Sequence, residues 1–504
     1  MQILNREEIK FADEYTIQHE PISSLELMER AARACVLSII NKVDDSASIF
    51  VFCGKGNNGG DGFAIARMLL ERSYNCTAIL VNYSTEFSVD CKANFDRLKE
   101  LKPEAIFEIS SESDLGKIKF TTEDVIIDAL LGTGLNKPLD GLLKDVVEFI
   151  NKNFLKVISI DCPTGIFIDT TNSPDDSIIR SSTTLTFQYP KLAFLMAQNK
   201  WAVPQFEVLN IGLHPHLAHL IKAKQFYIGK NEIKQLITKR QKFTHKGNFG
   251  HALIIAGNQT MRGAVSISAK ACLRSGAGLL TVHSVSKAID ALMCNLPEAM
   301  CSIDANSEFI CELPDLKNYN AIAIGPGIGT EQETADVLKK LLNYTSCSLV
   351  IDADALNILS ENKTWLSFLP PETILTPHPK EFDRLTEKHD SDIERYATAK
   401  HFALKHKVIV VLKGAYTSIC MPDGSSYFNS SGNSGLAKGG SGDALTGIIT
   451  GLLARGYTAP KAVLIGVYVH GYAADLATKK LSKESLLASD VIDKLGKAFL
   501  KLED

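Results

Sequence analysis

Short runs rich in valine and isoleucine alternate along this chain with longer stretches of helical periodicity. The first series of runs is SIFVFCG (48–54), CTAILVN (76–82), EDVIIDALLGTG (123–134) and KVISIDCPTG (156–165). A second series begins at HALIIAGN (251–258) and continues through NAIAIGPGIG, SLVIDADAL, ETILTPHPKE and KVIVVLKGAYT. Buried strands that alternate with helices are typical of parallel sheets covered by helices. The sequence therefore predicts an α/β protein, whose ligands bind beyond the carboxyl ends of its strands.

The two series are separated by a segment of different character. Residues 210–250 mix histidine, proline and basic residues and contain no comparable strand–loop–helix unit. At 504 residues the chain is also too long for one comfortable core. No repeat of fixed period links the halves. We therefore expect two unrelated α/β domains, over residues 1–215 and 225–504, with the boundary near residue 220.

Composition argues against several classes of function. A formal net charge of −4 offers no broad attraction to nucleic acid. No apolar run reaches the roughly 18 to 20 residues of a membrane helix, and the amino terminus lacks the apolar segment of a secretory signal. The 11 cysteines include no C-x-x-C pair, which favours reduced thiols over a zinc ribbon or a disulfide framework. We expect a cytoplasmic protein with small-molecule substrates and no nucleic-acid or membrane partner.

The loop after the first predicted strand reads GKGNNGGDG (54–62). It has the G-x-G-x-x-G spacing of a dinucleotide-binding loop, and the helix expected to start near Asp61 would present its positive end to a phosphate group. The second strand ends in Asn82, however, and supplies no carboxylate for a ribose. Asn57, Asn58 and Asp61 are therefore interpreted as contacts to a ligand or an ion. The alternative is that they only shape a turn and cap a helix.

Two aspartates stand at later strand ends of the same series. They are Asp128 in VIIDALLGTG and Asp161 in VISIDCPTG. Because the carboxyl ends of parallel strands meet at one edge of a sheet, both should reach the same crevice. The loop 132–138 could wrap phosphate groups through its amides and Lys137. Taken alone, each aspartate is equally well explained as the cap of the following turn.

In this order, GKGNNGGDGF, DALLGTG and DCPTG resemble the NAD(P)HX epimerases, which have a Rossmann-like three-layer α/β sandwich. The resemblance implies interconversion of the R and S forms of hydrated NADH and NADPH, called NADHX and NADPHX, with a bound K⁺. It implies substrate contacts from Asn57, Asn58, Gly59, Gly60, Asp61, Gly132, Thr133, Gly134, Leu135, Asn136, Lys137, Pro138 and Asp161. It implies potassium contacts from Asn58, Asp128 and Thr164. Inversion of the hydrated carbon requires proton transfer, for which Asp161 is assigned as general base.

The carboxyl half contains NSGLAKGGSGDALTG (433–447). Gly439, Gly440 and Gly442 lie beside the start of an expected helix, whose amides and positive end suit a phosphate group. Asp443 could accept the proton of a hydroxyl that attacks a phosphoryl group. An isolated aspartate here would be interpreted as an ordinary helix-start carboxylate, but the three glycines favour a catalytic role.

With GPGIG (325–329), TPHPKEF (376–382) and KGAYT (413–417), this motif resembles the ADP- or ATP-dependent NAD(P)HX dehydratases, which have a ribokinase-like α/β fold. The resemblance implies dehydration of the S form to NAD(P)H at the expense of ADP or ATP, with Mg²⁺ on the phosphates. Its bacterial character favours ADP. It implies substrate contacts from Ala264, Gly327, His378 and Asp443, with Asp443 catalytic. It implies nucleotide contacts from Lys413, Gly414, Ala415, Tyr416, Thr417 and Gly442.

Two alternatives remain open at this point. The carboxyl-terminal domain could be a ribokinase-like kinase that phosphorylates a vitamin or sugar hydroxyl and releases the product. The amino-terminal domain could be a catalytically silent nucleotide-binding scaffold. In either case we expect a homo-oligomer.

Overall fold

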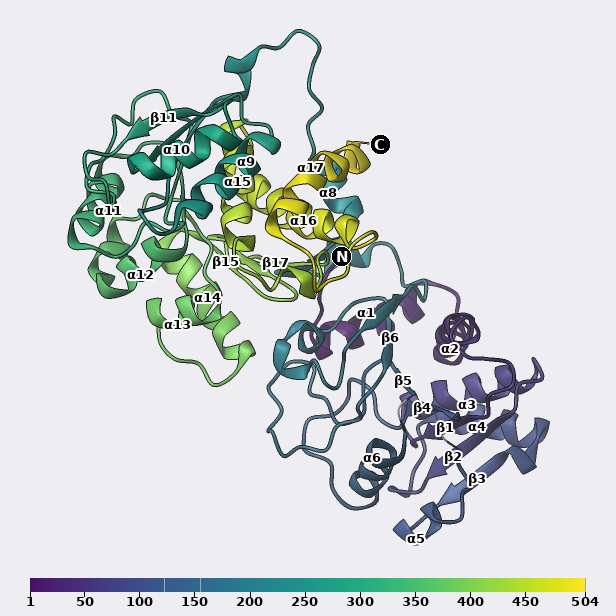
Figure 1. Ribbon diagram of the computed structural model, residues 1–504. Coiled ribbons are helices and arrows are strands. Elements are labelled where there is room, and N and C mark those ends of the chain that lie inside the picture. Colours follow the sequence, from purple (N-terminus) through teal and green to yellow (C-terminus); the bar gives the residue numbers. More distant parts are fainter. Residues whose placement is uncertain (122, 155, 504) are drawn as a thin grey trace. The chain divides into compact units, whose positions relative to one another are not determined.

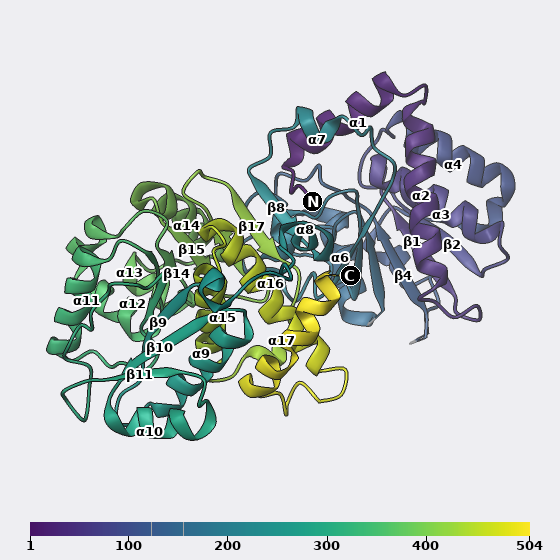
Figure 2. The ribbon, with the colours of Figure 1, turned by 90° about the horizontal axis from the view of Figure 1, so that it is seen from above.

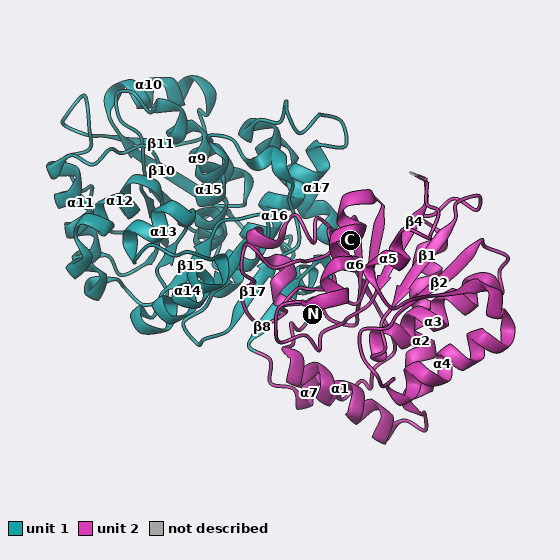
Figure 3. Ribbon diagram, turned by 90° about the horizontal axis from the view of Figure 1, so that it is seen from below, with its two compact units in different colours: residues 1, 224–504 teal, residues 2–223 magenta. Residues whose placement is uncertain are grey.

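The computed structural model describes residues 1–121, 123–154 and 156–503 and divides into two compact units. One unit comprises Gln2–Ala223, and the other contains Met1 and the chain from Lys224 onward (Figure 3). Each unit is built around its own sheet (Figure 1). Within the described ranges, no helix is both long and apolar enough to cross a membrane. All 11 cysteines are described, and none forms a disulfide.

The described part of the first unit forms a seven-stranded sheet with the order β3-β2-β1-β4-β5-β6-β7. Every pair of neighbouring strands is parallel. The strands are β1 (Ile49–Cys53), β2 (Cys76–Val81), β3 (Ile106–Ile109), β4 (Val125–Ala129), β5 (Val157–Ile160), β6 (Thr183–Phe187) and β7 (Phe206–Leu209). This order, with the first strands near its centre, is that of a doubly wound sheet. The predicted Rossmann-like fold is confirmed.

Helices cover both faces of this sheet. They are α1 (Arg6–His19), α2 (Ser24–Ile40), α3 (Asn57–Leu70), α4 (Val89–Leu101), α5 (Glu112–Leu115), α6 (Gly141–Asn153) and α7 (Leu217–Leu220). Short 3₁₀ turns occupy Pro103–Ala105, Leu192–Leu195 and Ala197–Asn199. One core contains Phe63 of α3 and Leu98 of α4, and a second contains Val146 and Ile150 of α6. Two separate cores on the two faces make this unit a three-layer sandwich.

The prediction of where α3 begins was wrong. The helix starts at Asn57 rather than near Asp61. Gly56 is its N-cap in an extended conformation, so the polar residues of the loop form the first helical turn. The consequence is that the Asn58 and Asp61 side chains are held by a regular helix.

The described part of the second unit forms a ten-stranded sheet with the order β11-β10-β9-β12-β13-β14-β15-β16-β17-β8. The strands are β8 (Gln225–Ile228), β9 (His251–Ile255), β10 (Leu279–Ser284), β11 (Met300–Ile303), β12 (Ala321–Ile324), β13 (Ser348–Ile351), β14 (Ile374–Leu375), β15 (Ile409–Leu412), β16 (Ser418–Cys420) and β17 (Ser426–Asn429). Most neighbouring strands are parallel, as predicted, but β16 is antiparallel to both β15 and β17. Short turns connect these three strands, and a parallel connection would need a longer crossover.

The segment before this sheet also differs from the prediction. Residues 210–250 do contain a short strand and helix, β8 and α8 (Lys230–Leu236), and β8 closes the sheet edge beside β17. The other helices of the unit are α9 (Arg262–Arg274), α10 (Ser286–Asn295), α11 (Gln332–Tyr344), α12 (Ala353–Glu361), α13 (Pro379–Leu385), α14 (Asp392–His406), α15 (Ser441–Ala454), α16 (Ala459–Ala477) and α17 (Ala488–Glu503). Short 3₁₀ turns occupy Lys246–Phe249, Lys363–Phe368 and Ser434–Leu436.

Helix α15 is the central helix of the second unit. It packs on β9, β12 and β13 and lies beside α9 (Figure 2). The two helices approach each other very closely. A Cβ atom at Gly447 would lie only 2.1 Å from the Ser268 carbonyl oxygen, and one at Gly451 would lie only 2.4 Å from the Cys272 carbonyl oxygen. Helix α15 is therefore packed tightly against α9, with its start at the carboxyl edge of the sheet.

Candidate functional site

The glycines of the loop after β1 have a packing role. A Cβ atom at Gly59 would lie 1.9 Å from the Gly54 carbonyl oxygen, and one at Gly62 would lie 2.7 Å from Ala129 Cβ. At Gly56, in contrast, no described atom comes within 4 Å of a Cβ atom. Close packing of α3 on the sheet therefore requires glycine at several of these positions, whether or not a ligand is bound.

This difference predicts different tolerance to alanine. Gly59→Ala should lower the free energy of local opening of α3 by about 3 kcal/mol, because its Cβ must displace backbone. Gly56 has a φ of −86° and open space around its Cβ position, so Gly56→Ala should lower the same free energy by about 1 kcal/mol at most. Hydrogen exchange of the α3 amides in the full chain measures both values. Equal protection in the two variants would contradict this account of the loop.

Three strand-end loops meet at Asn58. A Cβ atom built on Gly132, in the loop after β4, would lie 3.5 Å from Asn58 Cγ and 3.6 Å from Asp161 Oδ2. The Asn58 side chain is buried, and neither its Nδ2 nor its Oδ1 has a hydrogen-bond partner among the described residues. Leaving a buried amide unpaired costs about 1 to 3 kcal/mol. A ligand or an ion would remove this cost.

Asp161 follows β5 and is paired with a buried lysine. Lys191 Nζ lies 2.6 Å from Asp161 Oδ1 and 2.7 Å from Thr186 Oγ1. The Lys191 side chain is only 1% exposed. Asp161 itself has a φ of +63°, a left-handed conformation that is unusual for residues other than glycine. Strained backbone and a buried ion pair together are typical of functional sites.

Two further carboxyl groups belong to the same electrostatic environment. Burial raises the pKa of Asp61 well above its usual range, and the negative charge of Asp161 adds to this effect. Burial and the Asp161 charge also raise the pKa of Asp13, on α1, to about 7. The site thus contains two carboxyl groups with raised pKa values, those of Asp13 and Asp61, together with an Asp161 that is ion-paired with Lys191. Both a proton donor and a proton acceptor are available.

Asp128, on β4, joins the loops that follow β4 and β5. Its carboxylate accepts hydrogen bonds from Thr164 Oγ1 (2.6 Å), the Thr164 amide (2.9 Å) and Ser159 Oγ (2.8 Å). Burial raises the pKa of Asp128, and these hydrogen bonds oppose the increase. Of the three residues expected to contact potassium, the structure thus brings Asp128 and Thr164 together, while Asn58 has a free amide oxygen.

The remaining predicted residues of the first site are more open. In the loop 132–138, Gly134 and residues 136–138 are exposed. Lys137 Nζ lies 3.7 Å from Asp140 Oδ2, and both side chains are mostly in solvent. An exposed ion pair contributes little to stability, so Lys137 can reorient toward a phosphate group at little cost.

The second site centres on an ion pair between a partly exposed lysine and a buried aspartate at the carboxyl edge of the other sheet. Lys413 follows β15, and its Nζ lies 3.0 Å from Asp352 Oδ1 and 3.8 Å from Glu381 Oε2. Asp352 follows β13, and its Oδ2 accepts a hydrogen bond of 2.7 Å from Thr446 Oγ1 on α15. Sequence patterns did not identify Asp352, Glu381 or Thr446 as part of the site.

Asp443 lies in the first turn of α15. Burial raises its pKa to about 6, the negative charge of Asp352 adds to the increase, and Lys413 opposes it. Gly440 precedes the helix with a φ of +87°, where a side chain would be strained. A Cβ atom at Gly442 would lie 3.4 Å from Lys413 Nζ. A carboxylate with such a pKa is ionised at neutral pH and is a better base than an ordinary aspartate.

The other expected substrate residues are Ala264 in the first turn of α9, Gly327 in the loop after β12, and His378 at the start of α13. Gly327 has a φ of +64°, and a Cβ atom there would lie 3.3 Å from Ala264 Cβ, so these two residues are neighbours. His378 caps α13, where its Nδ1 accepts hydrogen bonds from the amides of Lys380 (3.1 Å) and Glu381 (3.3 Å). Burial lowers the pKa of His378, in keeping with a neutral ring that accepts at Nδ1.

The expected nucleotide loop connects β15 to β16. Thr417 Oγ1 donates a hydrogen bond of 3.0 Å to the Gly414 carbonyl, which holds the turn together. Gly414 and Ala415 are exposed at its tip. The first residue of this loop, Lys413, lies beside Gly442 at the start of α15.

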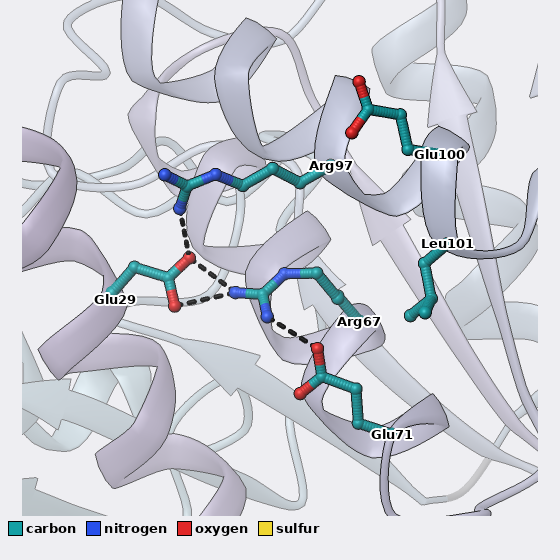
Figure 4. Close-up of a pocket in the computed structure, with 6 residues that line it drawn as sticks. All are labelled: Glu29, Arg67, Glu71, Arg97, Glu100 and Leu101. Atoms are coloured by element: carbon teal, nitrogen blue, oxygen red, sulfur yellow. Dashed lines mark hydrogen bonds and ion pairs between the residues drawn. The ribbon is translucent and has the colours of Figure 1, made fainter.

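A separate surface pocket of about 480 Å³ lies on α2, α3 and α4 of the first unit (Figure 4). Arg67 contacts Glu29 and Glu71, and Arg97 contacts Glu29. The pocket is lined by Glu29, Arg67, Glu71, Arg97, Glu100 and Leu101. Because carboxylates outnumber guanidinium groups, it does not favour a phosphate-bearing ligand.

Two family models match the chain. One, described as YjeF-related protein N-terminus, covers residues 24–193, and the other, described as NAD(P)H-hydrate dehydratase, covers residues 252–497. The curated bifunctional NAD(P)H-hydrate repair enzyme Nnr of Moorella thermoacetica is 31% identical, over 100% of this chain and 98% of its own. The enzyme of the same name from Escherichia coli is 30% identical, over 93% of this chain and 88% of its own.

Solved structures match the second half of the chain. A ribokinase-like superfamily protein from Enterococcus faecalis aligns with a TM-score of 0.50 and 30% identity, over 56% of this chain and 98% of its own. An ADP/ATP-dependent NAD(P)H-hydrate dehydratase from Bacillus subtilis, co-crystallised with ATP/Mg²⁺, aligns with a TM-score of 0.49 and 32% identity, over 55% and 99%. The predicted ribokinase-like fold of the second unit is confirmed by the first of these.

Proposed function

The chain belongs to the family of bifunctional NAD(P)H-hydrate repair enzymes. We propose that its two units each catalyse one of the two reactions. The first unit interconverts the R and S forms of NADHX and NADPHX, and the second dehydrates the S form to NAD(P)H at the expense of ADP or ATP. The observation that carries the function is that relatives named for this repair match the chain over nearly its whole length. A sugar or vitamin kinase is disfavoured by the same finding.

In the first unit, Asp161 is the general base. Epimerisation breaks and remakes a bond at the hydroxyl-bearing ring carbon, so one group must accept a proton and another must donate one. Lys191 Nζ lies 2.6 Å from Asp161 Oδ1 and holds this carboxylate in place. Asp13, whose pKa is raised by burial to about 7, can donate a proton near neutral pH, and burial also raises the pKa of Asp61. Both functions of an acid–base pair are thus present without a further residue.

The substrate of the first unit binds across the three strand-end loops. The unpaired Asn58 amide and the first turn of α3 (57–61) support contacts there, and the open loop 132–138 supports contacts to phosphate groups. The free Asn58 oxygen, the buried Asp128 carboxylate and the Thr164 hydroxyl are donors that fit a hard cation such as K⁺. When bound, K⁺ would supply positive charge beside a negatively charged substrate.

In the second unit, Asp443 takes the proton of the substrate hydroxyl. The hydroxyl oxygen then forms a bond to the terminal phosphorus of the nucleotide, whose Mg²⁺ complex is the co-substrate, and the bond to the departing nucleotide breaks. In the resulting phosphate ester, the phosphate group is a good leaving group, unlike the original hydroxyl. Loss of phosphate, with a proton from the neighbouring ring carbon, restores the dihydropyridine. Ala264, Gly327 and His378 contact this substrate.

The nucleotide is held by the loop 413–417 and by Gly442. Gly439 and Gly440 precede α15, so amides at this helix start can surround the transferred phosphoryl group. Lys413, adjacent to Gly442, contributes positive charge. Phosphoryl transfer depends mainly on such positioning and charge stabilisation.

A mixture of NADHX epimers tests this function. Without nucleotide, the epimer ratio should equilibrate and no dihydronicotinamide absorbance should return. With ADP, and to a smaller extent with ATP, both epimers should be converted to NADH, with one phosphate released per molecule. Accumulation of a phosphorylated product without recovery of absorbance would instead identify a kinase.

A further inference from the structure

Asp352 connects the two elements that carry the reacting groups of the second site. Its side chain is buried, and its two carboxylate oxygens have different partners, Lys413 after β15 and Thr446 on α15. Thr446 lies one helical turn after Asp443, and a Cβ atom at Gly442 would lie 3.7 Å from Asp352 Oδ2. One carboxylate thus spans the nucleotide loop and the catalytic helix.

The position of Asp352 in its own element does not explain these contacts. It is the N-cap residue of α12, where an aspartate ordinarily accepts hydrogen bonds from the first helical amides. In the described chain, its side chain makes no such capping hydrogen bond. Burial works against ionisation of this carboxyl group, but Lys413 and the Thr446 hydroxyl hold its pKa below the usual value. Asp352 is therefore a buried anion directed at the site.

We propose that Asp352 is a positioning residue of the second site, which holds the Lys413 ammonium group between the nucleotide loop and the start of α15. The inference rests on the dehydratase function proposed above. A lysine side chain is a flexible stem with a point charge at its end, so its location depends on its partners. Asp352, Glu381 and Asp443 all act on Lys413, and Asp352 is nearer than Glu381, at 3.0 Å compared with 3.8 Å.

The same geometry links Asp352 to the basicity of Asp443. The charged groups that act on Asp443 are Asp352, Asp354 and Lys413. On α16, His470 Nε2 lies 3.3 Å from Ser441 Oγ. Burial lowers the pKa of His470 to about 4, so its ring is neutral near pH 7. Removing the charge of Asp352 removes the strongest charge repulsion on ionised Asp443. This effect is larger than the opposing effect of Lys413, so the acid limb of the pH profile should move to lower pH even if Lys413 is displaced.

Asp352→Asn tests the proposal, with Asp354→Asn as its matched control. Asp354 is two residues away and also acts on Asp443, but its carboxylate binds the Gly329 amide (3.0 Å) rather than Lys413. In the full chain, Asp352→Asn should raise the KM for ADP about tenfold or more, because an ion-pair partner of Lys413 is lost. It should also move the acid limb of kcat/KM down by about one pH unit. Asp354→Asn should leave the KM for ADP within about threefold.

A double-mutant cycle separates positioning from general structural damage. If Asp352 acts through Lys413, then Asp352→Asn combined with Lys413→Gln should bind ADP no more weakly than Lys413→Gln alone, as measured by calorimetry. The double variant also leaves no unpaired ammonium group beside the buried position 352, so it remains informative if Asp352→Asn folds poorly. Additive losses, or an unchanged KM for ADP in Asp352→Asn, would overturn the proposal. Failure of the wild-type chain to dehydrate NADHX would overturn the function, whereas the calorimetric cycle tests the positioning independently of it.

Discussion

Asp443→Asn should reduce nucleotide-dependent dehydration by about 10³-fold while leaving epimerisation unchanged. Asparagine has nearly the same shape but cannot accept the substrate proton. Asp443 is the general base, and burial raises its pKa to about 6. A base acts in its ionised form, so wild-type activity should be full above this pKa and should fall as the pH drops below about 6. Initial rates of NADH formation from the S epimer, followed between pH 5 and pH 8, measure both effects.

Asp490→Asn is the matched control for Asp443→Asn. Asp490 is also the third residue of its helix, α17, and accepts a hydrogen bond of 2.9 Å from the Leu487 amide. If Asp443 were only a helix-start carboxylate, the two substitutions should have similar small effects. Full dehydration by Asp443→Asn would refute the assignment.

Loss of the folded state would not explain the expected result. Because the pKa of Asp443 is raised in the folded chain, the native state binds this proton more tightly than the unfolded state does. The stabilising contribution of this difference is full below the ordinary pKa of an aspartate and is lost as the pH rises through about 6. At pH 7 the neutral asparagine should therefore leave stability unchanged or slightly higher.

Asp161→Ala and Asp161→Asn should each reduce the rate of epimerisation by about 10³-fold. Dehydration of the pure S epimer should continue in both variants. Asparagine is the better test of chemistry, since it tolerates the left-handed φ of +63° at this position more readily than alanine does. Rates of R-to-S conversion by chiral chromatography, without nucleotide, measure the effect. Retained epimerisation in Asp161→Asn would refute the base assignment.

The buried lysine complicates this second test. Removing Asp161 leaves Lys191 without its carboxylate, and breaking a buried pair in this way costs about 3 to 5 kcal/mol. In Asp161→Asn combined with Lys191→Met, neither charge remains. We expect this double variant to recover stability but not epimerisation, which separates the loss of the base from the loss of the fold.

The sequence patterns predicted strands that are mostly apolar and missed some strands in which polar residues are frequent. The runs at β1, β4, β9 and β15 are almost entirely buried and consist mainly of hydrophobic residues, which makes them easy to identify. β6 is TTLTF and β3 is IFEI, which carry polar residues in short strands, so neither stands out. The antiparallel β16 arises from the geometry of a short turn, which hydropathy does not encode.

The candidate sites show the same division between local and distant information. Asp161 and Asp443 were recognisable because each follows or begins an element within a characteristic loop. Their environments depend on lysines and acids that are remote in sequence. Lys191 is 30 residues from Asp161, and Lys413 is 61 residues from Asp352. No local pattern relates such pairs, because only the folded sheet brings the strand ends together.

Complementation between two inactive variants tests the central claim, that one chain contains two independent sites for consecutive reactions. Neither Asp161→Asn nor Asp443→Asn alone should convert the R epimer of NADHX to NADH above the spontaneous rate in the presence of ADP. An equimolar mixture of the two should convert it at a rate comparable to that of the wild-type chain, since the S epimer made by one variant is the substrate of the other. If the mixture remains as inactive as its components, the assignment of separate epimerase and dehydratase sites is wrong.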